Sequence, residues 1–186
     1  MATNAFETIR LNAAGEEKSY QWYRQQISSL GKLTNTNQIL KDTKIATRLI
    51  PGEMYLFFYD PKHKDTLPYY DRLPLVLPFK KVPDGFYGIN LHYLPYMMRF
   101  RILGLLSDYA TGRDEDTRIQ LSWRLLNASS RLHPAKFAVK HYLNSHVKSR
   151  LYKIPYTDWV TASQLPVEKF VGAQKTKVWQ DFNSSL

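Results

Sequence analysis

Three runs of aromatic and aliphatic residues, separated by turn-forming residues, restrict the fold of this chain more than any other feature. The runs are EMYLFFYD at 53–60, LPLVLPF at 73–79 and FYGINLHYL at 86–94. Short apolar runs bounded by proline, glycine and charged residues are typical of β-strands. Asp84-Gly85, directly before the third run, is a hairpin signal. We therefore predict three antiparallel strands joined as a meander.

Prolines and a glycine refine the prediction for the second and third runs. The second run contains Pro74 and Pro78. Because proline cannot donate to a strand ladder, we expect this strand to be an edge strand or to be bounded by its prolines. Gly88, in the middle of the third run, indicates a bulge or a close backbone approach.

The third run has two different faces, because alternate side chains of a strand point in opposite directions. The apolar face, which we predict to be core, consists of Tyr87, Ile89, Leu91 and Tyr93. The opposite face is mixed and includes Asn90 and His92. A polar pair in this position is also a candidate catalytic pair, but we expect it on the solvated side of the sheet.

Helical patterns lie on both sides of the predicted sheet. Ser19 is a plausible N-cap and Gly31 suits the end of the helix between them. Further helices are expected at 95–110, from about 114, at 134–150, at 156–165 and at 166–182, with a fourth strand at 151–155. The predicted fold class is therefore α+β, with a small curved antiparallel sheet of SH3-like type at about 53–94 packed by flanking helices. We expect residues 1–50 to form a helical arm and 51–186 an α+β core domain with a basic helical C-terminal third.

Positive charge is concentrated in that C-terminal third. The chain carries a formal charge of +10, and residues 131–186 hold nine basic and three acidic side chains, against ten and nine in 51–130. A localised basic region is typical of proteins that bind a polyanion, most often nucleic acid. The candidate nucleic-acid-binding residues are Lys136, Lys140, His141, Lys148, Arg150, Lys153, Lys175 and Lys177. The same charges also suit an acidic protein neighbour or a solvated surface.

Few residue patterns indicate catalysis. The chain has no cysteine, which excludes disulfides, thiolate metal sites and a cysteine nucleophile. It also lacks a glycine-rich phosphate loop and a G-x-S-x-G motif. His141 and His146 are five residues apart, whereas zinc ligands on one helix face are three or four apart. We expect no catalytic residue, no metal and no cofactor.

Longer segments of the chain resemble a family of phage proteins. The segments are YDPKHKDTLPYYDRLPLVLPF, GFYGINLHYLP and VKSRLYKIPYTDWVTASQLPVEKFVGAQKTKVWQD, within residues 50–181. They are similar to small virion proteins of contractile-tailed phages of the T-even type, known as DNA end protectors or head-completion proteins. Residues 1–50 lie outside the resemblance and are a candidate docking arm.

The resemblance implies a structural, non-catalytic virion protein at or near the head–tail junction that contacts or protects the ends of packaged DNA. The implied location is the virion, and the host cytoplasm during assembly. The implied partners are other phage virion proteins of the head, neck or tail, with double-stranded DNA a further partner if the basic region lies against it. We expect no membrane partner, because the N-terminus has no signal-peptide pattern and no apolar run approaches about 18 residues.

Two alternatives from other classes stay open on the sequence. The first is a neck, tail or baseplate subunit that binds only protein, in which case the basic third faces acidic neighbours. The second is a metal-dependent phage nuclease, in which paired carboxylates hold Mg²⁺. The candidate carboxylates for that reaction are Asp60, Asp65, Asp71 and Asp84.

Overall fold

The computed structural model describes residues 4–41, 43–110, 124 and 136–186. The helices are α1 (Ala5–Ala13), α2 (Tyr20–Ser29), α3 (Thr36–Lys41), α4 (Tyr96–Ala110), α7 (Trp159–Gln164) and α8 (Lys175–Ser184), with short 3₁₀ turns η1 (Gly31–Thr34), η2 (Leu91–Tyr93), η3 (Asn144–His146) and η4 (Tyr156–Asp158). The strands are β1 (Lys44–Ala46), β2 (Met54–Leu56), β3 (Tyr70–Asp71), β4 (Leu75–Val82), β5 (Gly85–Asn90), β6 (Val139–Leu143), β7 (Leu151–Ile154) and β8 (Phe170–Val171). The helix predicted from about 114 lies outside the described residues.

The described strands form one larger and one smaller antiparallel sheet, which confirms the α+β class. The larger sheet has the order β1-β7-β2-β4-β5-β6, and β3 pairs with β8 in a separate two-stranded sheet. The predicted meander is its centre, since β2, β4 and β5 are neighbours. The SH3-like detail is not confirmed. The reason is that strands from outside the meander extend the sheet on both sides, β7 and β1 beyond β2 and β6 beyond β5.

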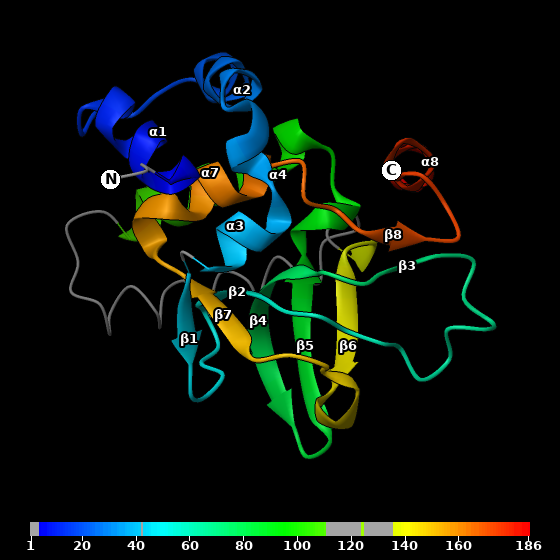
Figure 1. The fold of residues 1–186 in the computed structure, drawn as a ribbon. Coiled ribbons are helices and arrows are strands. Elements are labelled where there is room, and N and C mark those ends of the chain that lie inside the picture. The colour runs from blue at the N-terminus through cyan, green and yellow to red at the C-terminus, as the bar shows by residue number, and fades with distance from the viewer. Residues whose placement is uncertain (1–3, 42, 111–123, 125–135) are drawn as a thin grey trace.

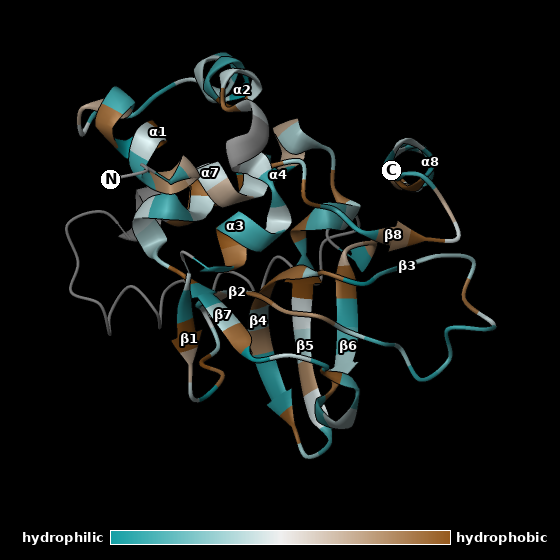
Figure 2. Cartoon of the chain, viewed as in Figure 1, coloured by the Kyte–Doolittle hydropathy of each residue, from teal (hydrophilic) through white to brown (hydrophobic). Residues whose placement is uncertain are grey.

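Helices gather on one side of the larger sheet and share a hydrophobic core with it. Figure 1 shows α1, α2, α3 and α7 gathered on the same side, above the strands, with α8 beyond the end of β6. The main hydrophobic core lies between these layers and joins Leu56, Leu77 and Ile89 of the sheet to Leu103 of α4 and Phe182 of α8. Figure 2 shows hydrophobic residues concentrated along β4 and β5, whereas α2 is largely hydrophilic. Of the helices in the described residues, none combines the length and apolar character that crossing a membrane requires.

The N-terminal helices pack into this same core. Ser19 caps α2 as predicted, accepting a hydrogen bond from the Trp22 amide at 3.2 Å. Phe6 and Ile9 of α1 are buried, and Arg10 pairs with Asp158 at 3.1 Å. The division of the chain into an arm and a core domain stays a prediction, but residues 5–41 contact the helices of the C-terminal half.

The other face of the sheet carries an aromatic cluster. Phe57, Tyr59, Phe86 and Tyr142 are buried there together, with ring centroids 4.9–5.9 Å apart for the pairs Tyr59–Tyr142, Phe57–Tyr142 and Phe57–Phe86. Figure 1 shows the chain from β2 to β3 crossing in front of β4, β5 and β6. Edge-to-face aromatic pairs add to the free energy gained by burying the rings. Phe57 and Tyr59 therefore attach this crossing segment to the sheet by packing against Phe86 and Tyr142.

The prediction for the second strand was wrong in one respect. β4 is not an edge strand, because it pairs with β2 on one side and with β5 on the other. Pro74 precedes the strand and Pro78 lies inside it, where the register with β5 shifts. Pro78 pairs with Gly88, and any side chain at Gly88 would collide with Val76. Gly88 is thus the predicted close approach, and the irregular register accommodates a proline without its amide hydrogen.

The prediction for the third strand holds on one face and fails on the other. Ile89, Leu91 and Tyr93 are buried as expected, while Tyr87 is half-buried and stacks on His141. Asn90 and His92 were expected on the solvated side, but both have 0% exposed surface. The strand ends at Asn90 and the chain turns into η2, so simple alternation stops there.

Two helix predictions in the basic third were also wrong, in whole or in part. The expected helix at 134–150 is, over the described residues from 139 onward, β6 followed by η3. The edge of β5 pairs with residues 139–143, so the sheet overrides the helical spacing of the lysines. In the expected helix at 166–182, only the part from Lys175 is helical, and Phe170–Val171 form β8. Gly172, with a φ of +89°, follows that strand.

Candidate nucleic-acid interface

A groove of about 400 Å³ opens beside the small β3–β8 sheet. Its lining residues come from the segment after β2, from the chain around β3, from the segment before β7 and from β8. They are Phe58, Tyr59, Asp60, Lys64, Tyr70, Arg72, Lys148 and Val171, and we call this site the β3–β8 groove. A volume of this size is typical of sites for small molecules, which occupy about 300–1,000 Å³.

Positive charge exceeds negative charge in the groove. Three cations, Lys64, Arg72 and Lys148, line it together with one carboxylate, Asp60, which gives a net charge of +2. Asp60 is neutralised by Lys64, whose Nζ lies 3.0 Å from Oδ1. The hydrogen bond from Lys64, together with the nearby charge of Lys148, lowers the pKa of Asp60. Arg72 and Lys148 are exposed and make no ion pair within the described residues, so their charges are available to a ligand.

Aromatic rings and Val171 form the rest of the wall. Phe58 and Tyr70 are half-buried, and Tyr59 is buried in the aromatic cluster below. A fourth cation, Lys169, lies with its Nζ 5.7 Å from the centroid of the Phe58 ring. Cations bind phosphates and aromatic faces stack on bases, so this combination suits a nucleotide.

Backbone hydrogen bonds hold the walls of the groove together. The Lys148 amide donates to the Phe58 carbonyl at 2.8 Å, and the Phe58 amide donates to Ser149 Oγ at 2.8 Å. On the other side, the Tyr59 amide donates to the Arg72 carbonyl at 3.0 Å. The backbone that carries Arg72 and Lys148 is therefore held in place by hydrogen bonds.

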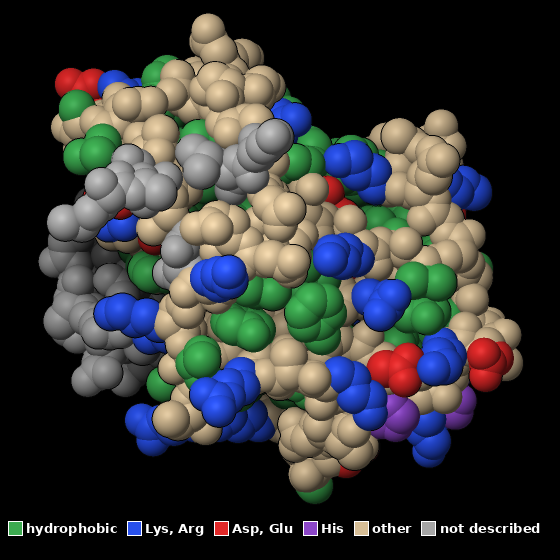
Figure 3. Space-filling view, viewed as in Figure 1, with side chains coloured by type: hydrophobic (Ala, Val, Ile, Leu, Met, Phe, Trp, Pro, Cys, Tyr) green, Lys and Arg blue, Asp and Glu red, His purple; other side chains and the backbone are tan. Residues whose placement is uncertain are grey.

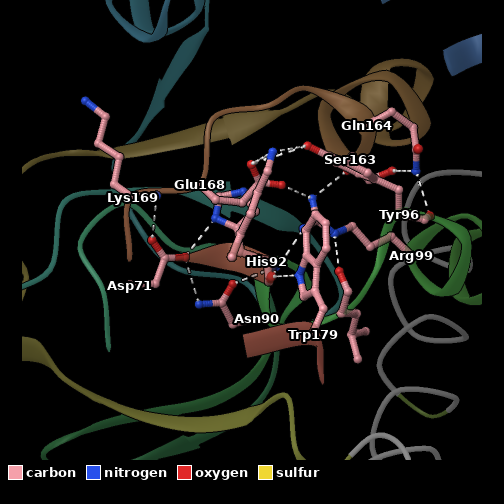
Figure 4. Close-up of polar contacts among 12 residues, drawn as sticks. Asp71, Asn90, His92, Tyr96, Arg99, Ser163, Gln164, Glu168, Lys169 and Trp179 are labelled. Atoms are coloured by element: carbon pink, nitrogen blue, oxygen red, sulfur yellow. Dashed lines mark hydrogen bonds and ion pairs between the residues drawn. The ribbon is translucent and has the colours of Figure 1, made fainter. Parts of the chain in front are cut away.

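Asp71 fixes the small sheet from inside. Its Oδ2 accepts hydrogen bonds from Asn90 Nδ2 at 3.2 Å and from His92 Nδ1 at 2.7 Å. Its Oδ1 accepts from the amides of Leu73 at 3.0 Å and Lys169 at 3.4 Å. Figure 4 shows Asp71 between the labelled Lys169 and the Asn90–His92 pair. This carboxylate therefore connects β3, β8 and the end of β5 beneath the groove.

A second buried group, Arg99 with Glu168, continues this network. The Arg99 guanidinium has 0% exposed surface and lies 2.8 Å from Glu168 Oε1. It also donates to the carbonyls of Leu94 at 2.7 Å, Ser163 at 2.9 Å and His92 at 3.2 Å. Trp179 Nε1 donates to the same His92 carbonyl at 2.9 Å, as Figure 4 shows. Helices α4, α7 and α8 are thereby tied to η2.

The charge of Glu168 is preserved despite its burial. Burial alone would raise its pKa, but the positive charges of Arg99, His92 and Lys175 outweigh burial and lower the pKa of Glu168 to about 2. Lys175 Nζ lies 3.5 Å from Glu168 Oε2 and donates to Tyr96 Oη at 3.0 Å. Glu168 is thus held ionised in the interior by Arg99 and Lys175. Among the described residues, the buried atoms His92 Nε2 and Gln164 Oε1 have no hydrogen-bond partner.

Several of the residues predicted to bind nucleic acid are paired with carboxylates. Lys153 lies 3.1 Å from Glu53, Lys177 2.6 Å from Asp181, and Lys175 belongs to the Glu168 network. His141 Nε2 lies 3.3 Å from Asp84 Oδ1. These four positions add little net charge to the surface.

The remaining predicted residues differ among themselves. Lys136, Lys148 and Arg150 are exposed, and Lys148 and Arg150 lie in the same segment beside the groove. Lys140 is partly buried, with its Nζ 4.1 Å from the centroid of the Tyr93 ring, and burial lowers its pKa to about 8. The structure therefore brings only part of the predicted set to one place.

Groove residues that the sequence did not single out include Phe58, Lys64, Tyr70 and Arg72. Phe58 belongs to the predicted strand at 53–60, and the other three lie in the turn-rich segment with charges and aromatics that follows it, up to residue 72. On the face of the molecule seen in Figure 3, Lys and Arg side chains surround hydrophobic patches, and Asp and Glu side chains are few. Exposed positive charge therefore extends beyond the C-terminal third.

The carboxylates considered for a nuclease are dispersed. Asp71 is buried in its hydrogen-bond network, Asp60 pairs with Lys64, and Asp84 contacts His141. Among the residues that the structure describes, no group of three or more His, Asp or Glu side chains is placed to hold a metal ion. The Asn90–His92 pair is buried and serves the interior of the fold.

Comparison with known proteins gives a family match. Residues 6–182 match the model of the family described as phage T4 terminal DNA protecting protein. The match extends through α1, α2 and α3, which the sequence resemblance left out. No curated protein and no solved structure matched the chain.

Proposed function

Because the chain belongs to the family of the phage T4 terminal DNA protecting protein, which protects DNA ends, we propose that it covers the end of duplex DNA through the face that carries the β3–β8 groove. The family match over residues 6–182 carries this proposal. A DNA-protecting family indicates a structural protein rather than an enzyme. On this proposal the protein excludes nucleases by occupying the end, and it performs no reaction itself.

The charge distribution supports this face as the contact surface. Arg72, Lys148, Arg150 and Lys169 are exposed and form no ion pair within the described residues. Phosphates are bound through such cations without reading the base sequence, and counterion release makes the binding sensitive to salt. The buried network beneath holds this face rigid. A rigid cationic surface loses little conformational entropy when it meets the DNA backbone.

An exonuclease assay tests the proposal directly. Linear duplex saturated with the protein should resist both 5′→3′ and 3′→5′ exonucleases, and linear DNA should outcompete closed circles of equal length. The logarithm of the affinity should fall with the logarithm of salt concentration at a slope of roughly −3 to −6, at about −0.9 for each phosphate contacted. Absence of binding to linear DNA at low salt would instead favour the protein-only neck or tail subunit.

A charge-matched pair of variants locates the surface. K148Q/R150Q/K169Q should flatten the salt slope by up to about three units if each side chain contacts one phosphate. The control K80Q/K81Q/R101Q removes the same charge from exposed positions outside the groove lining and should leave the slope close to that of the wild type. Equal flattening in both variants would show that net charge alone matters.

We further propose that the protein is carried in the virion, near the head–tail junction, with head, neck or tail proteins as its partners. A protector must be on the DNA end before nucleases reach it, which favours assembly into the particle. Its presence in purified virions and its position in a particle reconstruction test this location. Cleavage of DNA by the purified protein with Mg²⁺ or Mn²⁺, abolished by D60N, would overturn the non-catalytic proposal.

A further inference from the structure

We infer that the β3–β8 groove binds the terminal nucleotide of one DNA strand, with its base stacked on the groove aromatics and its phosphate on Arg72 and Lys148. This inference rests on the proposed function and adds the recognition of the end itself. The general cationic surface explains binding to duplex DNA of any kind. It does not explain why an end should be preferred.

The size of the groove indicates that it binds a single nucleotide. A volume of about 400 Å³ is in the range of small-molecule sites and much smaller than the side of a duplex. The phosphates of a duplex lie in rows along its outside, and its bases are stacked inside. A groove of this size therefore takes one nucleotide rather than a segment of double helix.

The residues that line the groove suit both the base and the phosphate of a nucleotide. Phe58 and Tyr70 line the groove and are only half-buried, so their rings are accessible to a base that enters it. Arg72 and Lys148 are cations without a carboxylate partner within the described residues, so they are suited to a phosphate. Lys64 is paired with Asp60, and the two charges cancel. The net charge of +2 in the groove therefore comes from Arg72 and Lys148.

The end preference follows from what it costs to move a nucleotide into such a groove. An internal nucleotide must break its stacking on both sides before it leaves the duplex, whereas a terminal one breaks stacking on one side only. One stacking step corresponds to about a tenfold difference in the equilibrium. The groove should therefore favour an open end over each internal site by about tenfold or more.

The rigid base of the groove fits this task. Asp71, immediately before Arg72, is held by four hydrogen bonds to Asn90, His92 and the amides of Leu73 and Lys169. Arg72 thus projects from a fixed backbone, and so does Lys148 through its bond to the Phe58 carbonyl. A site that is already formed loses less entropy on binding.

Photocrosslinking tests this placement. A linear duplex with 5-iodouracil at its terminal position should crosslink to the peptide that contains Phe58 or Tyr70, because the iodinated base reacts with an aromatic ring stacked on it. The same base in the middle of the duplex should give no such crosslink. A duplex whose ends are closed by hairpin loops should compete about tenfold less well than an open one.

Charge-matched variants test the phosphate contact. R72Q/K148Q should lower the affinity for open ends by about tenfold or more, since each lost contact is a hydrogen bond to a charged group. K80Q/K81Q, which removes the same charge at exposed positions outside the groove lining, should retain affinity within about twofold of the wild type. Duplexes with a 5′-phosphate, a 3′-phosphate or only hydroxyl ends show which strand enters, because the bound phosphate should raise affinity.

The outcomes separate the two proposals. If the wild type protects ends but the terminal base crosslinks outside the groove, or if both double variants lose affinity equally, the groove inference is wrong and end protection stands. The same holds if hydroxyl and phosphate ends bind equally. If the wild type shows no preference for linear DNA, the proposed function fails and the groove inference fails with it.

Discussion

Arg99 of α4 and Arg72, directly after β3, have opposite surroundings. Arg99 is fully buried, pairs with Glu168 and donates to three carbonyls. Arg72 is exposed and has no carboxylate partner within the described residues. The guanidinium of Arg99 is paired with a carboxylate and supports the fold, whereas the guanidinium of Arg72 is unpaired in the part of the chain that the structure describes and can contact a ligand.

The comparison extends to the regions around the two arginines. The buried network below the sheet has two acids, Asp71 and Glu168, facing Arg99, His92 and Lys175. The groove above it has cations in excess of its one acid. Breaking a buried ion pair destabilises a fold strongly, whereas an exposed charge contributes little to stability. We therefore expect changes in the network to alter stability and changes in the groove to alter binding.

The largest effect is expected from E168Q. The substitution leaves Arg99 as a buried charge without its carboxylate, and loss of one partner of a buried pair costs about 3–5 kcal/mol. Chemical denaturation of the variant and the wild type measures this difference. As a control, K177Q breaks the surface pair with Asp181 from its exposed side and should change the free energy of unfolding by less than about 1 kcal/mol. A small loss for E168Q would show that the network is not the support of the sheet.

Acid should reveal the same pair through its titration. The pKa of Glu168 lies at about 2, below its ordinary value of 4.5, so the unfolded chain binds the extra proton first. The stability from this carboxylate is therefore complete above about pH 4.5 and is lost as the pH falls towards 2. The loss amounts to about 3 kcal/mol. Denaturation between pH 5 and 2 should show a steeper decline for the wild type than for E168Q, and parallel curves would contradict the assignment.

An intermediate effect is expected where the network and the groove meet. Gly172 follows Val171 of β8, has a φ of +89°, and leaves no room for a side chain against the Pro68 carbonyl. G172A should therefore cost about 1–3 kcal/mol and also disturb the groove wall. G104A, in α4 with open space around it, should be neutral or slightly stabilising. Equal melting temperatures for the two variants would contradict this account of β8.

Much of the sheet was predictable from local pattern. The runs containing Met54, Leu77 and Ile89 have the composition of strands, and Asp84-Gly85 marks their hairpin. These strands are neighbours in sequence, so local signals suffice. β6 was mistaken for a helix because Lys136, Lys140 and His141 have helical spacing, while its real determinant is the edge of β5, about fifty residues away in the chain.

The candidate site was less predictable than the fold. The lysines of the C-terminal third were visible as charge, but charge counting cannot show that Lys153 faces Glu53 or that Lys177 faces Asp181. Arg72 gave no signal of its own, because its role depends on pairing between β3 and β8. Free and neutralised cations differ only in their spatial neighbours, and these neighbours come from distant parts of the chain.

The smallest effect on stability is expected from R72Q, which tests the difference between Arg72 and Arg99. Because Arg72 is exposed and forms no ion pair within the described residues, its replacement should change the free energy of unfolding by no more than about 0.5 kcal/mol. The affinity for open DNA ends should nevertheless fall by about tenfold. R99Q should show the reverse order, unfolding the protein before binding can be compared. A large stability loss in R72Q would mean that this arginine supports the sheet, and the separation of network and groove would then fail.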